Sequence, residues 1–408
     1  MDARRPANRR ETARQSCSAS WTLSRKRLII FGSTGSIGKR TLDVARDFRA
    51  AFEIVALSAS QSASLLEAQI EEFRPQAACL ADERLQAEAA RIASRAGVPV
   101  FCGAEGLMRL AREFPADLAV VATVGFAGLM PSLAALEAGC DLALANKEVL
   151  VAAGQIVTRR AAERGVRILP IDSEHNAVFQ CLGGAKPDCV RRIILTASGG
   201  PFRRMPKEDL ARVTVEQALA HPTWSMGPKI TIDSSTLMNK GFEVIEAHYL
   251  FRIPISRIEV VIHPESAIHS MVEYLDGSIL AQMGPTDMYL PIQNVLTYPR
   301  RLPNAFQPLD FARLGSLNFE APDMDRFPAL RLAFEAAKAA GTAPAALNAA
   351  NEVAVARFLR REIRYLDIPA IIADVLEAHT NTPEPALDDI HAVDRWARER
   401  ATQYAARV

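Results

Sequence analysis

A glycine-rich turn between an apolar strand and a helix constrains the fold of this chain more than any other feature. The turn is Gly32-Ser-Thr-Gly-Ser-Ile-Gly38, and it follows the apolar run Arg27-Leu-Ile-Ile-Phe31. A helix is expected over 39–48 and a second strand over 52–57, which together form a β-α-β unit with a right-handed crossover. Glycines in such a turn let the backbone approach a pyrophosphate at the helix N-terminus. The pattern predicts dinucleotide binding; the alternative is a tight turn without a ligand.

The alternation of strands and helices continues beyond this unit. Helices are expected over 62–73 and 83–96, and strands over 77–80, 98–101, 118–124, 142–145 and 166–171. This predicts an α/β fold whose N-terminal domain, residues 27–171, is doubly wound and Rossmann-like.

The rest of the chain differs in its hydrophobic pattern and composition. Alternating runs over 190–196, 258–262 and 278–282 predict a second sheet in a central α+β domain, residues 172–297. Residues 298–322 are rich in Pro and Asn and predict a linker. Residues 323–408 have helical patterning and predict a C-terminal helical bundle.

Composition excludes several classes of protein. A chain of 408 residues is too long for one core, and 48 Lys+Arg against 47 Asp+Glu gives a net charge of +1. No net positive field therefore favours nucleic acid or an acidic membrane as a partner. The uncharged stretch 118–136 is interrupted by Gly125, Gly128 and Pro131, so no transmembrane segment is predicted.

The cysteines and the N-terminus bear on location. Six cysteines without a C-x-x-C pair are typical of buried apolar residues in a reducing compartment, which favours the cytoplasm of a bacterium. Residues 1–26 are basic and are interpreted as a disordered extension; an organelle transit peptide is the alternative.

The end of the second strand indicates which cofactor is used. An NAD enzyme usually carries an acid there to hold the ribose hydroxyls. This chain has Leu57-Ser-Ala-Ser-Gln-Ser62 instead, without a carboxylate. The missing acid removes repulsion against a 2′-phosphate and favours NADPH over NADH.

Two acidic clusters predict a metal site. In Asp172-Ser-Glu-His175, carboxylates at i and i+2 of an extended segment would point the same way and grip a hard cation; the alternative is a helix cap. In Asp233–Glu243, Ser234 or Ser235 is expected to cap a helix that runs to Phe251. Asn239 and Glu243 would share one face of that helix, whereas Glu246 is expected on a different part of it, away from the ligand groups.

Three further segments supply polar groups. Ser198-Gly-Gly-Pro-Phe202 offers backbone N–H groups and a hydroxyl to an anion, and Asn146-Lys-Glu148 follows a strand at the carboxyl edge of the sheet. His221-Pro-Thr-Trp-Ser-Met-Gly227 is predicted to be a lid loop, because loop tryptophans often exclude water from a reaction. A buried anchoring role for Trp224 is the alternative.

Together these segments, with Asn348-Ala-Ala-Asn-Glu-Val-Ala354, resemble the 1-deoxy-D-xylulose-5-phosphate reductoisomerases over nearly the whole chain after the basic extension. The resemblance implies a homodimer that uses NADPH and Mg²⁺, Mn²⁺ or Co²⁺. It implies that residues 27–171 bind the NADPH, and that residues 172–297 form the catalytic domain, which binds metal and substrate and carries the lid loop. It implies isomerisation and reduction of 1-deoxy-D-xylulose 5-phosphate to 2-C-methyl-D-erythritol 4-phosphate, in the non-mevalonate route to isoprenoids.

The resemblance also implies residue roles. The metal ligands would be Asp172, Glu174 and Glu243, which together with Lys147 and His221 are the expected catalytic residues. The substrate-binding residues would be Lys147, Ser173, Ser198, His221, Ser234, Asn239, Lys240 and Glu243. The cofactor-binding residues would be Thr34, Gly35, Ser36, Ile37, Ala59, Gln61, Asn146, Glu148 and Gly227. The chain departs from many members after the second strand, where Ala59-Ser-Gln-Ser62 stands in place of Gly and a Lys, Arg or Asn.

Two alternatives remain open, and the second belongs to a different class of protein. One is an NADP-dependent dehydrogenase of another phosphorylated sugar or semialdehyde; semialdehyde enzymes need a nucleophilic Cys near a His, and no Cys lies in the candidate loops. The other is a non-catalytic NADPH-binding sensor, which would not need three convergent carboxylates and a lid.

Overall fold

The computed structural model describes residues 25–224 and 226–405. The basic extension predicted for residues 1–26 lies outside this range except for Arg25 and Lys26, and Lys26 already belongs to the first strand. In the described part of the chain, every helix is too short or too polar to cross a membrane.

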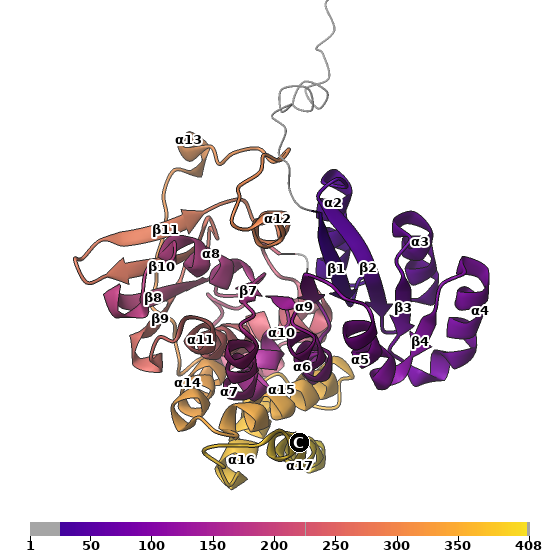
Figure 1. Cartoon of the computed structure of the whole chain (residues 1–408). Helices are drawn as coiled ribbons and strands as arrows, with labels where there is room; N and C mark the ends of the chain where they lie inside the picture. Colours follow the sequence, from indigo (N-terminus) through magenta and orange to yellow (C-terminus); the bar gives the residue numbers. More distant parts are fainter. Residues whose placement is uncertain (1–24, 225, 406–408) are drawn as a thin grey trace, which may run out of the picture.

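The N-terminal part is a parallel sheet of seven strands in the order β4-β3-β2-β1-β5-β6-β7 (Figure 1). The strands are β1 (Lys26–Phe31), β2 (Phe52–Ala59), β3 (Ala77–Leu80), β4 (Val100–Cys102), β5 (Leu118–Val121), β6 (Asp141–Leu144) and β7 (Ile168–Pro170). The helices between them are α2 (Ser36–Asp47), α3 (Ala63–Phe73), α4 (Gln86–Ala96), α5 (Gly103–Glu113), α6 (Leu129–Glu137) and α7 (Lys147–Arg164). The predicted doubly wound α/β fold is confirmed.

Each face of this sheet has its own core, because successive side chains of a strand point to opposite faces. In β1, Ile29 and Phe31 pack with α5, α6 and α7, whereas Leu28 and Ile30 pack with α2, α3 and α4. β1 pairs with both β2 and β5, so the strand order reverses there. Ligands of doubly wound folds bind at the carboxyl ends of the strands at such a reversal.

The glycine turn lies at this reversal, between β1 and α2. Gly32 has φ +85, and a Cβ on it would lie 2.6 Å from the carbonyl oxygen of Ala122. A Cβ on Gly38 would lie 2.2 Å from the carbonyl oxygen of Gly32, so helix and strand pack too closely for any other residue.

The second sheet has four strands in the order β11-β10-β8-β9. They are β8 (Val190–Ala197), β9 (Ile258–Ile262), β10 (Ile268–Tyr274) and β11 (Ile279–Met283). The sequence did not predict β10, because its buried positions include the polar residues His269, Ser270 and Glu273, which hide the alternation of apolar and polar residues. Helix α8 (Ser173–Leu182) packs against β10 and β11.

The predicted helix from Ser234 or Ser235 to Phe251 is wrong at its start. Two helices occupy this region, α10 (Pro228–Ser235) and α11 (Met238–Phe251). Leu237 between them has φ +62, which breaks the helical path. Ser234 and Ser235 therefore end one helix instead of capping the next.

The C-terminal bundle comprises α14 (Pro328–Ala339), α15 (Ala343–Leu359), α16 (Asp367–Ala378) and α17 (Leu387–Gln403), at the bottom of Figure 1. Its apolar core is continuous with α10 and α11, since Ile232 and Phe242 belong to the same buried cluster as Leu330 and Ile371. The bundle thus supports the helices that carry the second acidic cluster.

The segment before the bundle crosses the molecule. Helix α12 (Tyr289–Thr297) packs against α2 and β7, and its residues Tyr289, Ile292 and Leu296 complete the α2 side of the first core. Residues 298–322 are mostly irregular, with the short helix α13 (Phe311–Leu314) and one bridge between Ile262 and Glu320.

Candidate active site

A cavity of about 510 Å³ lies between the first turn of α2, the carboxyl end of β6 and the helices α8, α10 and α11. The predicted site residues that line it are Ser36, Ile37, Lys147, Asp172, Ser173, Glu174, Ser198, His221, Gly227, Ser234, Asn239, Lys240 and Glu243. The other predicted residues, Thr34, Gly35, Ala59, Gln61, Asn146 and Glu148, lie outside its lining. One cavity therefore collects side chains from segments that are far apart in the sequence.

The three acidic side chains predicted as metal ligands converge in this cavity. Asp172, Glu174 and Glu243 each bring one carboxylate oxygen to within 4.8 Å of the others. Asp172 stands at the N-cap of α8 but makes no side-chain cap bond, so its carboxylate is free to face the cavity. The expectation that the pair lies in an extended segment is wrong, because Glu174 belongs to the first turn of α8.

Two ammonium groups lie among these carboxylates. Lys147 Nζ is 2.6 Å from Asp172 Oδ2, 3.2 Å from Glu243 Oε1 and 2.7 Å from Asn239 Oδ1. Lys240 Nζ is 2.9 Å from Glu174 Oε1 and also bonds Glu243. The cluster thus holds three carboxylates and two ammonium groups with little exposure to water.

Burial and neighbouring charge set the protonation of the cluster. Burial would lower the pKa of Lys147, but the charges of Asp172 and Glu243 outweigh it and hold that pKa well above its usual range. Burial, with the charge of Glu174 beside it, raises the pKa of Glu243 to about 7. Burial is the larger cause, so the raised pKa reflects chiefly the cost of taking a charged carboxylate out of water.

The donor set fits a hard divalent cation. Carboxylate oxygens are the ligands that Mg²⁺ and Mn²⁺ prefer, and three of them converge here beside a cavity open to small molecules. A cation bound there would pair with these carboxylates and lower the pKa of Glu243 toward its usual range.

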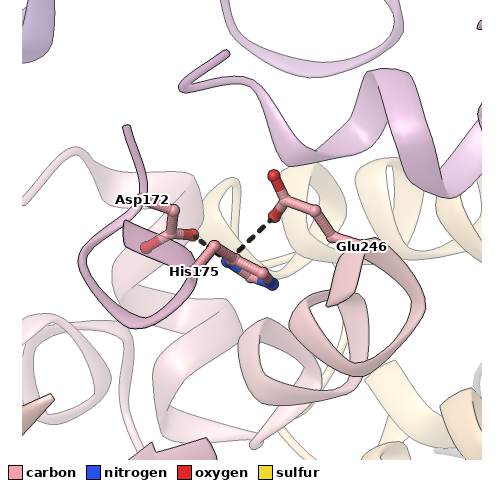
Figure 2. A group of neighbouring side chains, drawn as sticks. All are labelled: Asp172, His175 and Glu246. Carbon is pink, nitrogen blue, oxygen red and sulfur yellow. Dashed lines mark ion pairs between the residues drawn. The ribbon is translucent and has the colours of Figure 1, made fainter. Parts of the chain in front are cut away.

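A second group behind the first shares Asp172 (Figure 2). His175 Nδ1 lies 3.4 Å from Glu246 Oε2 and 3.9 Å from Asp172 Oδ2, and His175 Nε2 lies 2.9 Å from the carbonyl oxygen of Glu243. Both His175 and Glu246 are fully buried. The expectation that Glu246 lies away from the ligand groups is therefore wrong: it faces the ring that backs Asp172.

The loop 221–227, which was predicted to be a lid, brings a histidine to two hydroxyl groups. His221 Nε2 is 3.1 Å from both Ser198 Oγ and Ser234 Oγ, and His221 Nδ1 accepts hydrogen bonds from the backbone N–H groups of Thr223 and Trp224. Because Nδ1 accepts, Nε2 carries the proton of the neutral ring and donates. Burial lowers the pKa of His221, which favours this neutral form.

Trp224 lines the cavity from the lid and is only partly buried. Its ring centre lies 6.5 Å from that of His269 on β10. This position agrees with a residue that covers the cavity and disagrees with a fully buried anchor.

Comparison with known proteins identifies the family. The family model for 1-deoxy-D-xylulose 5-phosphate reductoisomerase matches residues 28–154, the model for its C-terminal domain matches 168–251, and a DXP reductoisomerase C-terminal domain matches 283–400. The 1-deoxy-D-xylulose 5-phosphate reductoisomerase of Chlorobium chlorochromatii is 52% identical over 377 residues, which cover 92% of this chain and 99% of that protein. The protein of the same name from Gloeobacter violaceus is 51% identical over 92% of this chain and 96% of its own length. This chain belongs to the 1-deoxy-D-xylulose 5-phosphate reductoisomerase family.

Solved reductoisomerase structures share the whole fold. The Zymomonas mobilis enzyme in complex with NADPH superimposes with a TM-score of 0.87 at 44% identity, over 92% of this chain and 98% of that one. A reductoisomerase in complex with NADPH, fosmidomycin and magnesium gives a TM-score of 0.88 at 42% identity, over 92% of this chain and 97% of that one.

In this reductoisomerase chain, two predicted cofactor residues have side chains that are already engaged. Asn146 caps α7 by accepting a hydrogen bond from Val149 N, and its Nδ2 donates to the carbonyl oxygens of Thr123 and Gly125. Glu148 Oε1 lies 2.5 Å from Lys229 Nζ. Asn146 and Glu148 therefore shape the cavity wall from behind.

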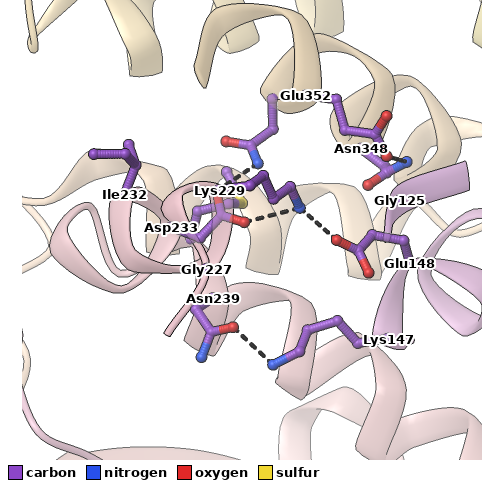
Figure 3. Close-up of polar contacts among 12 residues, drawn as sticks. Gly125, Lys147, Glu148, Gly227, Lys229, Ile232, Asp233, Asn239, Asn348 and Glu352 are labelled. Carbon is purple, nitrogen blue, oxygen red and sulfur yellow. Dashed lines mark hydrogen bonds and ion pairs between the residues drawn. The ribbon is translucent and has the colours of Figure 1, made fainter. Parts of the chain in front are cut away.

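Lys229 is the centre of a network of ion pairs that follows the loop 221–227 in the chain (Figure 3). It follows Gly227 by two residues, and its Nζ also lies 2.8 Å from Asp233 Oδ2. Asn351 Nδ2 on α15 donates to Asp233 Oδ1 at 2.8 Å. Burial would lower the pKa of Lys229, but Asp233 and Glu148 outweigh it and raise that pKa. The network ties the C-terminal end of the lid to α7 and to the helical bundle.

Helix α15, which carries Asn351, also contacts the loop after β5. Glu352 Oε1 accepts hydrogen bonds from Phe126 N at 3.0 Å and from Asn348 Nδ2 at 3.1 Å, and Glu352 Oε2 from Arg398 Nη2 at 2.7 Å. Gly125 has φ +68, and a Cβ there would lie 2.7 Å from Glu352 Oε1. The Asn348–Ala354 motif thus joins the bundle to the first sheet.

Several residues that line the cavity were not predicted from the sequence. They are Lys39, Arg40, Ile230, His269 and Asp287, among others that line it. His269 was missed with its strand. Arg40 on α2 and Asp287 before α12 form an ion pair although they are 247 positions apart in the sequence. Such a contact can be seen only in the folded structure.

Proposed function

We propose that this protein carries out the NADPH-dependent isomerisation and reduction of 1-deoxy-D-xylulose 5-phosphate to 2-C-methyl-D-erythritol 4-phosphate. One observation supports this above all: the three carboxylates Asp172, Glu174 and Glu243 open into the same cavity as the first turn of α2, where a dinucleotide pyrophosphate would bind. A metal-held sugar phosphate and a nicotinamide could therefore meet in one enclosed space.

In this proposal Asp172, Glu174 and Glu243 hold Mg²⁺, Mn²⁺ or Co²⁺. When bound, such a cation supplies Lewis-acid polarisation of carbonyl and hydroxyl oxygens and orients the substrate for the skeletal rearrangement. Lys147 and Lys240 already pair with these carboxylates, so they limit the net charge of the cluster and keep it compact. His175 backs Asp172 from the protein interior.

The substrate would be held by Lys147, Ser173, Ser198, His221, Ser234, Asn239 and Lys240. His221 donates from Nε2 toward Ser198 and Ser234, so these three groups form one hydrogen-bonding surface for phosphate and hydroxyl oxygens. Lys147 and Asn239 lie beside the carboxylates and would orient the reacting end. The partly buried Trp224 would exclude water when the lid closes over the substrate.

The cofactor would lie across the carboxyl end of the first sheet. The glycine turn and the first N–H groups of α2 would face the pyrophosphate. The residues at this point are Thr34, Gly35, Ser36 and Ile37. Ala59 and Gln61 would lie near the adenosine ribose. Asn146, Glu148 and Gly227 would border the nicotinamide half, the first two by fixing α7 and the lid.

We further propose that the protein is a cytoplasmic homodimer, a state that its resemblance to the family favours. Residues 27–171, 172–297 and 323–408 would be its cofactor, catalytic and helical domains, joined by the linker 298–322. The packing of α12 against the first core qualifies this division, because residues 289–297 contact the cofactor domain.

The decisive experiment follows NADPH absorbance while the purified protein is mixed with 1-deoxy-D-xylulose 5-phosphate and Mg²⁺ or Mn²⁺. We expect oxidation of NADPH that needs both the sugar phosphate and the metal, with methylerythritol phosphate as the product. Oxidation with a different phosphorylated sugar or a semialdehyde, and none with this substrate, would favour a related dehydrogenase. In the described residues no Cys lines the cavity, so the thiol route of semialdehyde enzymes lacks its nucleophile.

A further inference from the structure

The residues after β2 leave one question about the cofactor open: which cation meets the 2′-phosphate of NADPH. In doubly wound folds this phosphate lies at the carboxyl end of the second strand, often beside an arginine. Here that end carries Ser60, Gln61 and Ser62, which have no positive charge. The answer rests on the proposed use of NADPH by this protein.

The loop after β3 runs directly beside the loop after β2. Ala81 N donates to the carbonyl oxygen of Ala59 at 2.8 Å, and Asp82 N donates to that of Ser60 at 3.3 Å. The two loops therefore stay paired beyond the last residues of their strands. Gln61 Nε2 donates to Asp82 Oδ2 at 2.9 Å, which joins their side chains as well.

Asp82, in the loop after β3, brings a carboxylate beside the end of β2, although the loop after β2 contains no acidic residue. Its Oδ1 accepts hydrogen bonds from Arg84 N at 3.1 Å and Arg84 Nε at 2.9 Å. Its Oδ2 accepts from Arg84 Nη2 at 2.6 Å and from Gln61. Each oxygen thus already receives two hydrogen bonds, which leaves little capacity to bind the ribose hydroxyls of NADH.

The same bonds fix the Arg84 guanidinium at the surface. The Arg84 side chain is 80% exposed, whereas that of Asp82 is 12% exposed. Asp82 engages two of the five guanidinium N–H groups, and no other side-chain partner for Arg84 occurs within residues 25–224 and 226–405. Three directed donors therefore remain for an anion beside the end of β2.

We propose that Arg84 binds the 2′-phosphate of NADPH and sets the preference over NADH, with Asp82 and Gln61 as positioning residues that hold its guanidinium. Arginine suits this task because its planar fork matches phosphate oxygens at two points. Asp82 balances the charge of Arg84, so recognition depends on directed contact more than on a long-range field. This arrangement also explains how NADPH is used without a cation after β2.

The test measures the phosphate contact apart from catalysis. Binding of adenosine 2′,5′-bisphosphate and of AMP is compared by titration calorimetry in the full-length protein and in Arg84→Gln. We expect the bisphosphate to bind about tenfold or more weakly to the variant, since a hydrogen bond to a charged group is lost, while AMP binds equally to both. The ratio of kcat/KM for NADPH to that for NADH should fall by the same factor, with kcat at saturating NADPH within about twofold.

Arg95→Gln is the matched control, because Arg95 is an exposed cation of the following helix α4 whose partners are Glu67 and Glu71. It removes the same charge and should leave both ligands unaffected. If Arg84→Gln binds the bisphosphate as tightly as Arg95→Gln does, the assignment is wrong. Arg84→Glu is a second test of the same assignment. This variant should lose the preference for the bisphosphate over AMP, and a retained preference would also overturn the assignment.

These outcomes are distinct from failure of the proposed function. An unmodified protein that does not oxidise NADPH with 1-deoxy-D-xylulose 5-phosphate refutes the function. The calorimetry contains no sugar phosphate and no metal, so its result concerns Arg84 alone.

Discussion

Replacing Glu243 with Gln should move two properties of the protein in opposite directions. Glu243 is fully buried, and burial together with the charge of Glu174 raises its pKa from 4.5 to about 7. Between these values the folded, metal-free protein keeps a proton at Glu243 that the unfolded chain has released. Stability therefore falls as the pH rises from about 4.5 to 7, and the loss is complete above that window.

The magnitude follows from the size of the shift. A difference of roughly 2.5 pKa units at about 1.36 kcal/mol each gives a loss of about 3 kcal/mol at pH 8. Gln has nearly the same shape as Glu but carries no charge, so its burial does not incur the desolvation cost of a carboxylate. The variant should therefore not lose stability over this pH range. Lys147 and Lys240 each lose one partner but keep Asp172 and Glu174. The expected gain at pH 8 is therefore at most about 3 kcal/mol, and it should vanish near pH 4.5.

Metal binding should change in the other direction. An uncharged ligand in place of a carboxylate weakens the attraction for a divalent cation, so the rise in melting temperature with Mn²⁺ should shift to much higher metal concentration. Activity should drop by orders of magnitude. Melting curves recorded with a chelator at pH 5 and pH 8, and then with increasing Mn²⁺, measure both effects.

The control for this variant is Glu259→Gln, an exposed carboxylate on β9 that pairs with Arg192. It should change neither the pH dependence of stability nor the response to Mn²⁺. Glu246 cannot serve, because it is buried against His175. If Glu243→Gln melts lower than the unmodified protein at pH 8 without metal, the reasoning from burial is wrong. An unchanged response to Mn²⁺ would instead refute the three-carboxylate site.

Other substitutions test the lid, the cofactor edge and the buried network. Trp224→Ala should lower kcat and leave the melting temperature within a few degrees; a loss of ~3–5 kcal/mol, as for a buried aromatic residue, would contradict the lid. Gln61→Glu places a second carboxylate against Asp82 and should lower kcat/KM for NADPH far more than for NADH, measured with both cofactors. Lys229→Met leaves Glu148 without its ion pair and should cost about 3–5 kcal/mol in urea unfolding, part of which the added change Glu148→Gln should restore.

Much of the first domain could be predicted from sequence because its strands are buried on both faces. Runs such as Leu28–Phe31 and Ala77–Leu80 are apolar throughout, and glycine or polar turns separate them from helices. The second sheet was harder, since β10 buries polar residues and loses the alternation that marks a strand. The break at Leu237 was missed for a similar reason: leucine favours helix, and only the packing of α10 and α11 imposes its left-handed backbone.

The site was predictable where one short segment carries several functional groups. Asp172 and Glu174, or Asn239 and Lys240, stand so close in sequence that their chemistry is visible before folding. Pairs that meet across long distances were not visible. The contact of Glu246 with His175 needs the approach of α11 to α8, and that of Gln61 with Asp82 needs the pairing of β2 with β3.

The crossing of α12 to the first sheet has a consequence for synthesis on the ribosome. Most of the apolar side chains that pack with Tyr289, Ile292 and Leu296 belong to strands and helices that are complete by residue 171. Roughly 120 more residues must be translated before α12 emerges, which takes about 6–25 s at ordinary elongation rates. During that interval the nascent first sheet exposes apolar side chains beside α2 and β7, so we expect chaperones to bind the chain at this stage.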